Sequence, residues 1–107
     1  MNKSIYRAVG EDEYVELMET KQFSLLDGGV DVKYFGMDLN ETVAFANKRV
    51  NRHVVAIFEV ILPIAVLNKL GDFTDVDPFL FRSGSVEIAA ENLSEFNKSI
   101  IKIIHRV

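Results

Sequence analysis

The segment HVVAIFEVIL at residues 53–62 is the part of the sequence that decides the fold class. β-Branched and other apolar residues occupy both of its faces, a pattern typical of a strand that is nearly buried on both sides. Pro63 follows directly and suits the first position of a short helix, which we expect to end before Gly71. The combination indicates a domain of mixed α and β structure.

Two further elements are predicted at the N-terminal end of the chain. Strand-forming residues that alternate with period two predict a strand over Ser4–Val9, which Gly10 ends. The acidic run Glu11-Asp12-Glu13 complements the positive end of a helix dipole and therefore predicts the start of a helix. That helix has an apolar stripe at i, i+3 and i+4 spacing, formed by Tyr14, Leu17 and Met18.

The region between this helix and the central strand predicts more strand, turn and helix. Gln22–Leu25 fits a short strand, Asp27-Gly28-Gly29 is a turn signal, and Val32–Gly36 fits another strand. Asp38-Leu39-Asn40-Glu41 has the spacing of a capping box, so we expect a helix to begin there. One face of that helix would be formed by Val43, Ala46 and Val50.

The C-terminal part of the sequence completes the prediction. Pro78–Arg82 and Ser85–Ala89 fit the strands of a hairpin around Ser83-Gly84. Glu91–Asn97 fits a helical turn, and Ile100–Val107 fits either a helix or a strand. Taken together, residues 1–107 predict a single α+β domain with a mostly antiparallel sheet and two to three helices.

The composition excludes several classes of protein. The chain has 107 residues, with 12 Lys and Arg against 16 Asp and Glu, and a formal net charge of −4. Nucleic-acid clamps usually have a basic face, so this balance argues against DNA as a partner. The absence of cysteine excludes disulfides, thiolate zinc sites and a cysteine nucleophile. The most apolar region, residues 54–67, is interrupted by Glu59 and Pro63 and is too short to span a membrane, so we expect a soluble protein.

Two charged residues interrupt apolar rows of the predicted strands. Arg7 shares a strand face with Ile5 and Val9, and an unpartnered guanidinium would be costly to bury there. Arg7 therefore needs a carboxylate, carbonyl groups or an anionic ligand. Glu59 lies among apolar residues of the central strand, and we expect it either at a sheet edge or as the internal partner of a cation such as Arg7.

Further candidate site residues lie near strand ends. Glu87 shares a face with the small residues Ser85 and Ala89, so it belongs either to an exposed surface or to the floor of a pocket. Tyr34-Phe35 precede Gly36 and fit either the core or a stacking platform for a ligand ring. His53 and His105 are the only imidazoles, and two histidines can act as a general acid–base pair, although a strand start for His53 and a tail position for His105 are the favoured explanations.

Several strong motifs are absent from the sequence. It contains no phosphate-binding loop of the G-x-x-x-x-G-K-S/T type, no G-x-G-x-x-G and no H-E-x-x-H. The G-x-S-x-G nucleophile elbow is also missing. Two separated histidines without clustered ligands argue against a zinc site, so we expect no metal.

The succession of these segments resembles the ADP-ribosyltransferase-like fold, in particular the compact C-terminal toxin domains of large secreted bacterial proteins. The resemblance begins with Ile5-Tyr6-Arg7-Ala8-Val9 and a following helix, and continues with Lys33-Tyr34-Phe35-Gly36. A helix containing Asn40-Glu41-Thr42-Val43-Ala44-Phe45-Ala46 comes next, and Ser85-Val86-Glu87-Ile88 ends the match. The resemblance covers most of the chain, and each of its motifs is short.

The resemblance implies an NAD-consuming enzyme, either an ADP-ribosyltransferase or an NAD glycohydrolase, with NAD as co-substrate. Arg7 on the first strand would bind NAD, and Glu87 on a late strand would be the catalytic carboxylate. Tyr34 and Phe35 would lie at the nicotinamide end, together with Phe45. The resemblance also implies a secreted effector that acts in the cytoplasm of a target cell, with a cognate immunity protein as partner; a cytoplasmic protein is the other option.

The sequence departs from the family pattern and leaves alternatives open. Phe35-Gly36-Met37 stands where one major class has Ser-Thr-Ser, and no Glu-x-Glu pair is present, which argues against a protein arginine as acceptor. A metal-independent ribonuclease toxin is the main alternative, and it would use His53 with Arg7 or Lys33 and the basic residues 48–53 to cleave RNA. The third option is a non-catalytic interaction or immunity protein, in which Arg7 and Glu87 are structural.

Overall fold

The centre of the molecule is a long antiparallel pair of strands, β1 (Asn2–Gly10) and β3 (Val54–Pro63). The pairing runs from Asn2 opposite Pro63 to Gly10 opposite Val54, with a register shift between Val9 and Gly10. Ile5 and Val60 face each other across it and are fully buried. Both strands agree with the prediction to within one or two residues at each end. They appear in this computed structural model, which describes residues 1–24, 32–74 and 78–107.

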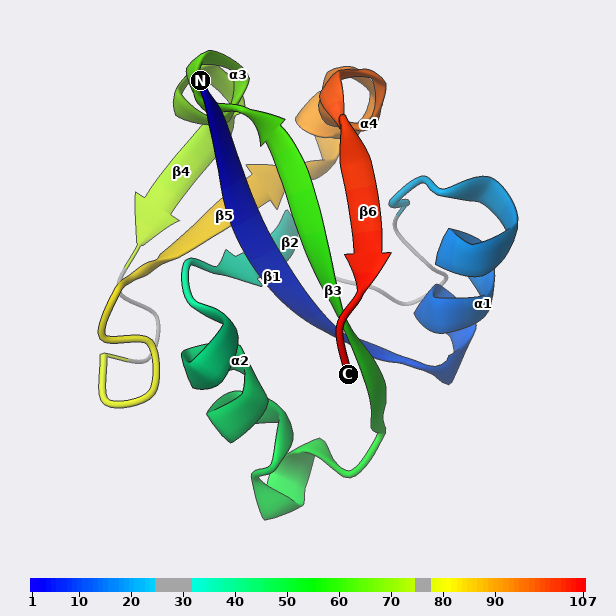
Figure 1. Ribbon diagram of the computed structural model, residues 1–107, viewed down its shortest axis with the longest axis vertical. Coiled ribbons are helices and arrows are strands. Elements are labelled where there is room, and N and C mark those ends of the chain that lie inside the picture. Colours follow the sequence, from blue (N-terminus) through cyan, green and yellow to red (C-terminus); the bar gives the residue numbers. More distant parts are fainter. Residues whose placement is uncertain (25–31, 75–77) are drawn as a thin grey trace.

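Four shorter strands extend this pair into a six-stranded sheet in the order β4-β5-β2-β1-β3-β6. Every neighbouring pair is antiparallel, as Figure 1 shows. The predicted α+β domain with an antiparallel sheet is therefore confirmed. The added strands are β2 (Val32–Gly36), β4 (Gly71–Thr74), β5 (Ser85–Ala89) and β6 (Lys102–His105).

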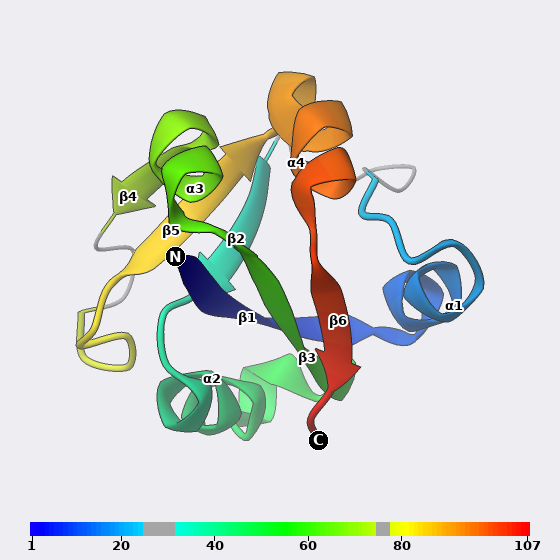
Figure 2. The same ribbon diagram turned by 45° about the horizontal axis from the view of Figure 1, so that its top comes forward.

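Helices cover the two faces of the sheet unequally (Figure 2). α1 (Glu11–Thr20), α3 (Ile64–Leu70) and α4 (Leu93–Ser99) bury apolar side chains in the core on one face, whereas α2 (Leu39–Ala46) lies against the other. Two 3₁₀ turns, η1 (Arg49–Asn51) and η2 (Ala90–Asn92), precede β3 and α4. The α-helices of the described residues number four, one more than the upper limit of the prediction, because the expected helical turn near residue 93 is a full helix.

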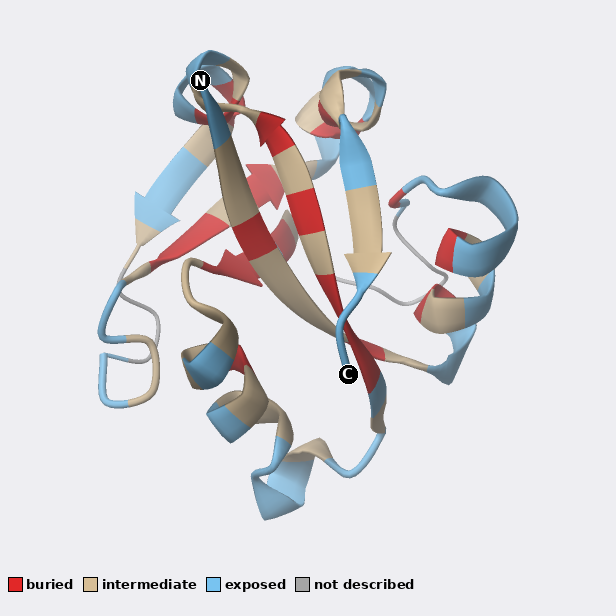
Figure 3. Cartoon of the chain, in the orientation of Figure 1, coloured by how far each residue is buried: buried red, intermediate tan, exposed pale blue. Residues whose placement is uncertain are grey.

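The main core lies between the sheet and the three helices, and Figure 3 shows its buried residues along the central strands. Phe23, Phe35 and Phe96 contact one another at its centre, with ring centroids 5.4–5.9 Å apart. Leu17 of α1 and Leu67 of α3 are almost fully buried beside them. Aromatic packing of this kind is a large source of stability in a small domain.

The predicted hairpin strand over Pro78–Arg82 is wrong. Residues 78–83 form turns and irregular structure, and the partner of β5 is instead β4, with Gly71 opposite Ile88 and Thr74 opposite Ser85. The alternation of Phe79 and Phe81 resembles a strand, but Phe79 is 89% exposed and Pro78 has no N–H for a ladder. Gly84, at φ +87°, turns the chain into β5.

The predicted strand over Gln22–Leu25 is also not formed by its described residues. Gln22–Ser24 are irregular because the side chain of Asn97 takes the place of a neighbouring strand. Its Oδ1 accepts from the backbone N–H of Phe23 at 2.8 Å, and its Nδ2 donates to the carbonyl of Phe23 at 2.8 Å. Leu25 and the turn predicted at residues 27–29 lie outside the described residues.

The C-terminal segment, for which the sequence allowed either a helix or a strand, forms β6 at the edge of the sheet. Phe58 lies opposite His105 in this pairing, and their rings stack at 5.1 Å. Within the described parts of the chain, no helix is both long and apolar enough to cross a membrane.

Candidate functional site

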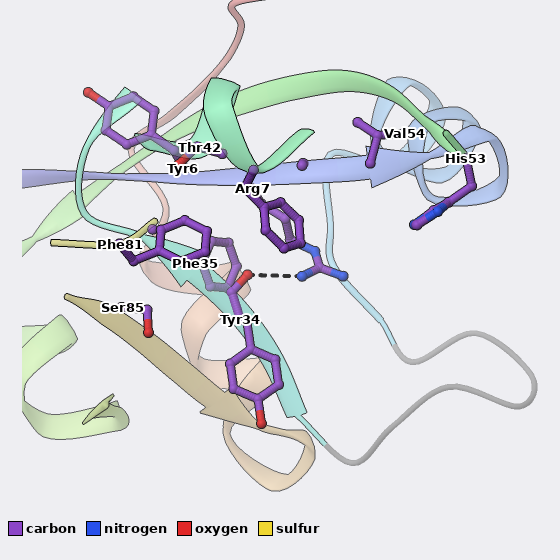
Figure 4. A pocket seen from close by; sticks show the side chains of 12 residues that line it. Tyr6, Arg7, Tyr34, Phe35, Thr42, His53, Val54, Phe81 and Ser85 are labelled. Atoms are coloured by element: carbon purple, nitrogen blue, oxygen red, sulfur yellow. Dashed lines mark hydrogen bonds between the residues drawn. The ribbon is translucent and has the colours of Figure 1, made fainter. Parts of the chain in front are cut away.

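The sheet opens between β1 and β2, and a cavity lies at this opening. These two strands pair only around Tyr6 and Gly36, whereas β1 pairs with β3 and β2 pairs with β5 along their lengths. The cavity has a volume of about 270 Å³ and is shown in Figure 4. Its lining comprises Tyr6, Arg7, Ala8, Tyr34, Phe35, Gly36, Thr42, Phe45, His53, Val54, Phe81 and Ser85.

Arg7 projects from β1 into this opening, and its guanidinium is held on two sides. Nε and Nη2 donate to the two carboxylate oxygens of Glu13, at 2.5 and 2.9 Å. Nη1 donates to the carbonyl of Tyr34 at 2.9 Å, the hydrogen bond drawn in Figure 4. Its Cζ lies 5.9 Å from the ring centroid of Phe35. The sequence required a carboxylate, carbonyl groups or an anion for this residue, and the structure provides the first two.

Glu59 is not the partner of Arg7. Arg7 lies opposite Phe58 in the β1–β3 register, so Glu59 points to the other face of the sheet. There it accepts a 2.5 Å hydrogen bond from the hydroxyl of Ser4 and lies 3.6 Å from Nε of Arg106. Its carboxylate thus has other partners.

Glu13 of α1 belongs to the candidate site, although sequence reasoning did not single it out. It is 5% exposed and also accepts from the ammonium of Lys33, at 3.1 Å. Burial by itself raises the pKa of Glu13, but hydrogen bonds and the charges of Arg7 and Lys33 outweigh it and leave that pKa lowered. A usable signal was present, because Glu13 lies four residues before Leu17 and therefore on the apolar stripe of its helix.

Tyr34 connects the cavity to Glu87. The two residues face each other in the β2–β5 register, and the hydrogen bond and charge of the Glu87 carboxylate raise the pKa of the Tyr34 hydroxyl. Glu87 is half-buried and does not line the cavity itself, although Ser85, on the same face of β5, does. Glu87 consequently lies at the margin of the opening, one side chain away from the lining.

Aromatic rings form one wall of the cavity. Phe45 of α2 and Phe81 of the segment before β5 have ring centroids 5.3 Å apart. The carboxylate of Glu41 anchors this segment, because it accepts from the backbone N–H and the hydroxyl of Ser83 at 3.0 and 2.7 Å. Gly36 allows the close approach of these parts, since a Cβ there would lie 2.5 Å from Oγ1 of Thr42. The sequence did not indicate Phe81 as a candidate, because its pattern predicts a hairpin strand over Pro78–Arg82 rather than a segment beside a cavity.

The structure brings together only some of the residues of the ribonuclease alternative. His53 lines the cavity with Arg7, but Lys33 is buried and bound to Glu13. His105 packs against Phe58, and its Nε2 lies 2.9 Å from the backbone oxygen of Val107, to which it donates in the tautomer with a hydrogen on that nitrogen. The described residues contain no cluster of side chains suited to holding a metal ion.

The arrangement combines a fixed cation, aromatic walls and a nearby carboxylate. Such a cavity suits an anionic ligand that also carries a flat ring, because the guanidinium binds oxyanions and the rings provide stacking surfaces. Comparison of the chain with protein-family models, with curated proteins and with solved structures gave no match.

Proposed function

We propose that this chain has an ADP-ribosyltransferase-like fold and consumes NAD, by ADP-ribosyl transfer or by hydrolysis, as a toxin or effector domain. One observation carries the proposal: Arg7 of β1 and Tyr34 with Phe35 of β2 line one cavity, and Glu87 of the neighbouring strand β5 lies opposite Tyr34 at its margin. The family resemblance assigns NAD binding and catalysis to a first-strand arginine, middle-strand aromatics and a late-strand glutamate. The strand order β5-β2-β1 makes their strands neighbours, and Tyr34 connects the two charged residues: its carbonyl accepts from Arg7, and its side chain lies opposite Glu87.

Arg7 would bind the diphosphate of NAD. A guanidinium has five N–H donors, of which Arg7 uses three for Glu13 and Tyr34. Within the described residues the other two, one on each terminal nitrogen, have no protein acceptor in the hydrogen bonds of the structure. A guanidinium with two free N–H groups matches the paired oxygens of a phosphate, which is the geometry that makes arginine the preferred residue for this purpose.

The aromatic cavity would hold the nicotinamide end of the dinucleotide. A volume of about 270 Å³ lies near the lower limit of small-molecule sites, so it holds part of NAD rather than all of it. The remainder would extend over the margin of the opening, where Tyr34 is 41% exposed and is bonded to Glu87. This placement brings the ribose next to the nicotinamide close to the carboxylate.

Glu87 would then stabilise the charge that develops as the bond between nicotinamide and ribose breaks. The electron pair of this bond leaves with nicotinamide, a neutral ring, and the ribose carbon becomes oxocarbenium-like. A carboxylate at this carbon lowers the barrier electrostatically. Water or another acceptor then bonds to the same carbon and releases a proton, so hydrolysis yields nicotinamide, ADP-ribose and one proton. No strong general acid is required, in agreement with a cavity whose single imidazole belongs to His53.

The ribonuclease alternative has less support from the arrangement of side chains. RNA binding relies on several exposed cations along a groove. Here Arg7 is shared with Glu13, Lys33 is buried, and the exposed basic residues Lys48, Arg49 and Arg52 lie on the turn beside His53. The resemblance to toxin domains also implies a cognate immunity protein as partner and a target in another cell. Both belong to the same proposal.

Incubating the purified chain with NAD and following nicotinamide release by chromatography tests this function. We expect turnover by the wild type and, in Arg7→Ala, an increase in KM of about 10- to 100-fold, the loss typical of a hydrogen bond to a charged group. Arg49→Ala is the matched control, since Arg49 is exposed on η1, and it should retain the KM of the wild type. Intact NAD with degraded tRNA or rRNA would point to the ribonuclease, and no reaction with either substrate to an interaction module.

A further inference from the structure

A buried cluster of three charges lies behind the proposed NAD site. Glu13 contributes one carboxylate, and Arg7 and Lys33 contribute two cations. Both Nη2 of Arg7 and Nζ of Lys33 contact the same oxygen of Glu13, at 2.9 and 3.1 Å, so the two nitrogens are at most about 6 Å apart. The side chains of Glu13 and Lys33 are only 7% and 6% exposed, whereas that of Arg7 is 20% exposed and reaches the cavity.

The charges of this cluster do not cancel. A bidentate pair of Arg7 and Glu13 alone would be neutral, and its attraction for an anion would be weak. Lys33 adds a second positive charge, so the cluster as a whole carries +1 next to the cavity. Because Glu13 and Lys33 are both buried, mobile ions screen this charge much less than they screen a surface residue.

Glu13 also determines how the guanidinium is presented. It binds the side of the guanidinium formed by Nε and Nη2, while the carbonyl of Tyr34 binds Nη1. Three contacts on two sides fix the plane of the group before any ligand arrives. Such preorganisation lowers the entropy cost of ligand binding.

We propose that Glu13 and Lys33 are positioning residues of the anion site: Glu13 fixes the orientation of Arg7, and Lys33 offsets the charge of Glu13, so that a positive charge remains for a diphosphate. This inference rests on the proposed function, because the diphosphate is that of NAD. It gives Lys33, which contacts neither the cavity nor a ligand, a role in affinity. It also explains why a lysine, which is rarely buried, lies on the core side of β2.

Binding of ADP-ribose and of inorganic pyrophosphate, measured by calorimetry without turnover, tests the inference. Lys33→Met removes the offsetting charge and keeps the Arg7–Glu13 pair, and we expect the Kd for each probe to rise about 5- to 20-fold. Lys69→Met is the matched control: it makes the same change in net charge, but Lys69 is 67% exposed and pairs with Glu95 on the surface, so its Kd should stay unchanged.

The double variant Glu13→Gln/Lys33→Met separates charge from stability. It removes one negative and one positive charge, leaves Arg7 with a net +1, and retains an amide oxygen as acceptor, so we expect at least half of the lost affinity, on a logarithmic scale, to return. A structural role for Lys33 would leave the affinity of the folded fraction unchanged in the single variant and would give no recovery in the double variant. Circular dichroism and thermal unfolding show the folded fraction in each case.

The possible results distinguish this inference from the proposed function. If the wild type binds the probes and Lys33→Met binds them with the same Kd, the inference is overturned, whereas the proposal of NAD consumption stands. Binding with the expected variant pattern, but without nicotinamide release from NAD, supports the inference and contradicts the enzymatic function. A wild type that binds neither probe at millimolar concentration overturns both.

Discussion

Replacing Glu87 by glutamine is expected to slow nicotinamide release from NAD by about 10²- to 10³-fold, the loss typical of removing one group that stabilises transition-state charge. Glutamine keeps the size of the side chain and an acceptor for the Tyr34 hydroxyl, but it has no negative charge to oppose a positive ribose carbon. The effect should therefore be in kcat, with KM almost unchanged. Steady-state kinetics of nicotinamide release separates the two parameters.

A matched control for this variant lies on the same segment of the chain. Glu91 is exposed on η2, four residues after Glu87, and Glu91→Gln makes the same chemical change away from the opening. Its kinetics should equal those of the wild type. If Glu87→Gln turns over NAD within threefold of the wild-type rate, the catalytic role assigned to Glu87 is wrong, even if the chain consumes NAD.

Replacing Glu13 by alanine should have the largest effect on stability, a loss of about 3–5 kcal/mol in the free energy of unfolding, because it leaves two cations inside the protein without their shared carboxylate. Glu95→Ala breaks the exposed pair with Lys69 and should lose about 1 kcal/mol or less. Urea denaturation of both variants at neutral pH measures the difference. Equal losses in the two variants would show that the buried cluster contributes no more than a surface ion pair.

The same cluster predicts how stability depends on pH. The pKa of Glu13 in the folded chain is below its ordinary value of 4.5, since the partners Arg7 and Lys33 outweigh burial. The stabilisation from its ionised form is thus fully present above about pH 4.5 and is lost as the pH falls through the lowered pKa. Glu13→Gln has no such group, so the gap in unfolding free energy between it and the wild type should narrow in acid. A gap that stays constant from pH 7 to pH 3 would contradict this assignment.

The sequence was sufficient for the strands that pack on both faces or alternate cleanly. β1 and β3 are predicted almost to the residue because the apolar pattern of each corresponds directly to burial in the sheet. The sequence pattern did not predict the structure where a long-range contact, rather than the local sequence, determines the backbone conformation. The side chain of Asn97 satisfies the backbone of Phe23, and β4, four residues containing Gly71 and Asp72, has little strand propensity of its own and depends on pairing with β5.

The candidate site was predicted only in part, again because long-range contacts determine the partners of its residues. Arg7 stood out because a cation in an apolar row needs a partner, but the identity of that partner depends on which way each neighbour points. Glu59 follows Phe58, the register partner of Arg7, and so faces away, whereas Glu13 reaches Arg7 from the first turn of α1. The opening between β1 and β2 depends on where pairing stops, and no local pattern specifies that position.

The central claim is that the opening between β1 and β2 binds the NAD skeleton, and an NMR titration of the ¹⁵N-labelled chain with ADP-ribose tests it most directly. We predict that backbone amide shifts concentrate at lining residues such as Arg7, Ala8 and Gly36, and that the amide of Lys69 on α3, which does not line the cavity, stays unchanged. We also predict that Arg7→Ala abolishes these shifts at the same ligand concentration. No shifts at millimolar ADP-ribose, or shifts confined to residues outside the opening, would contradict the central claim.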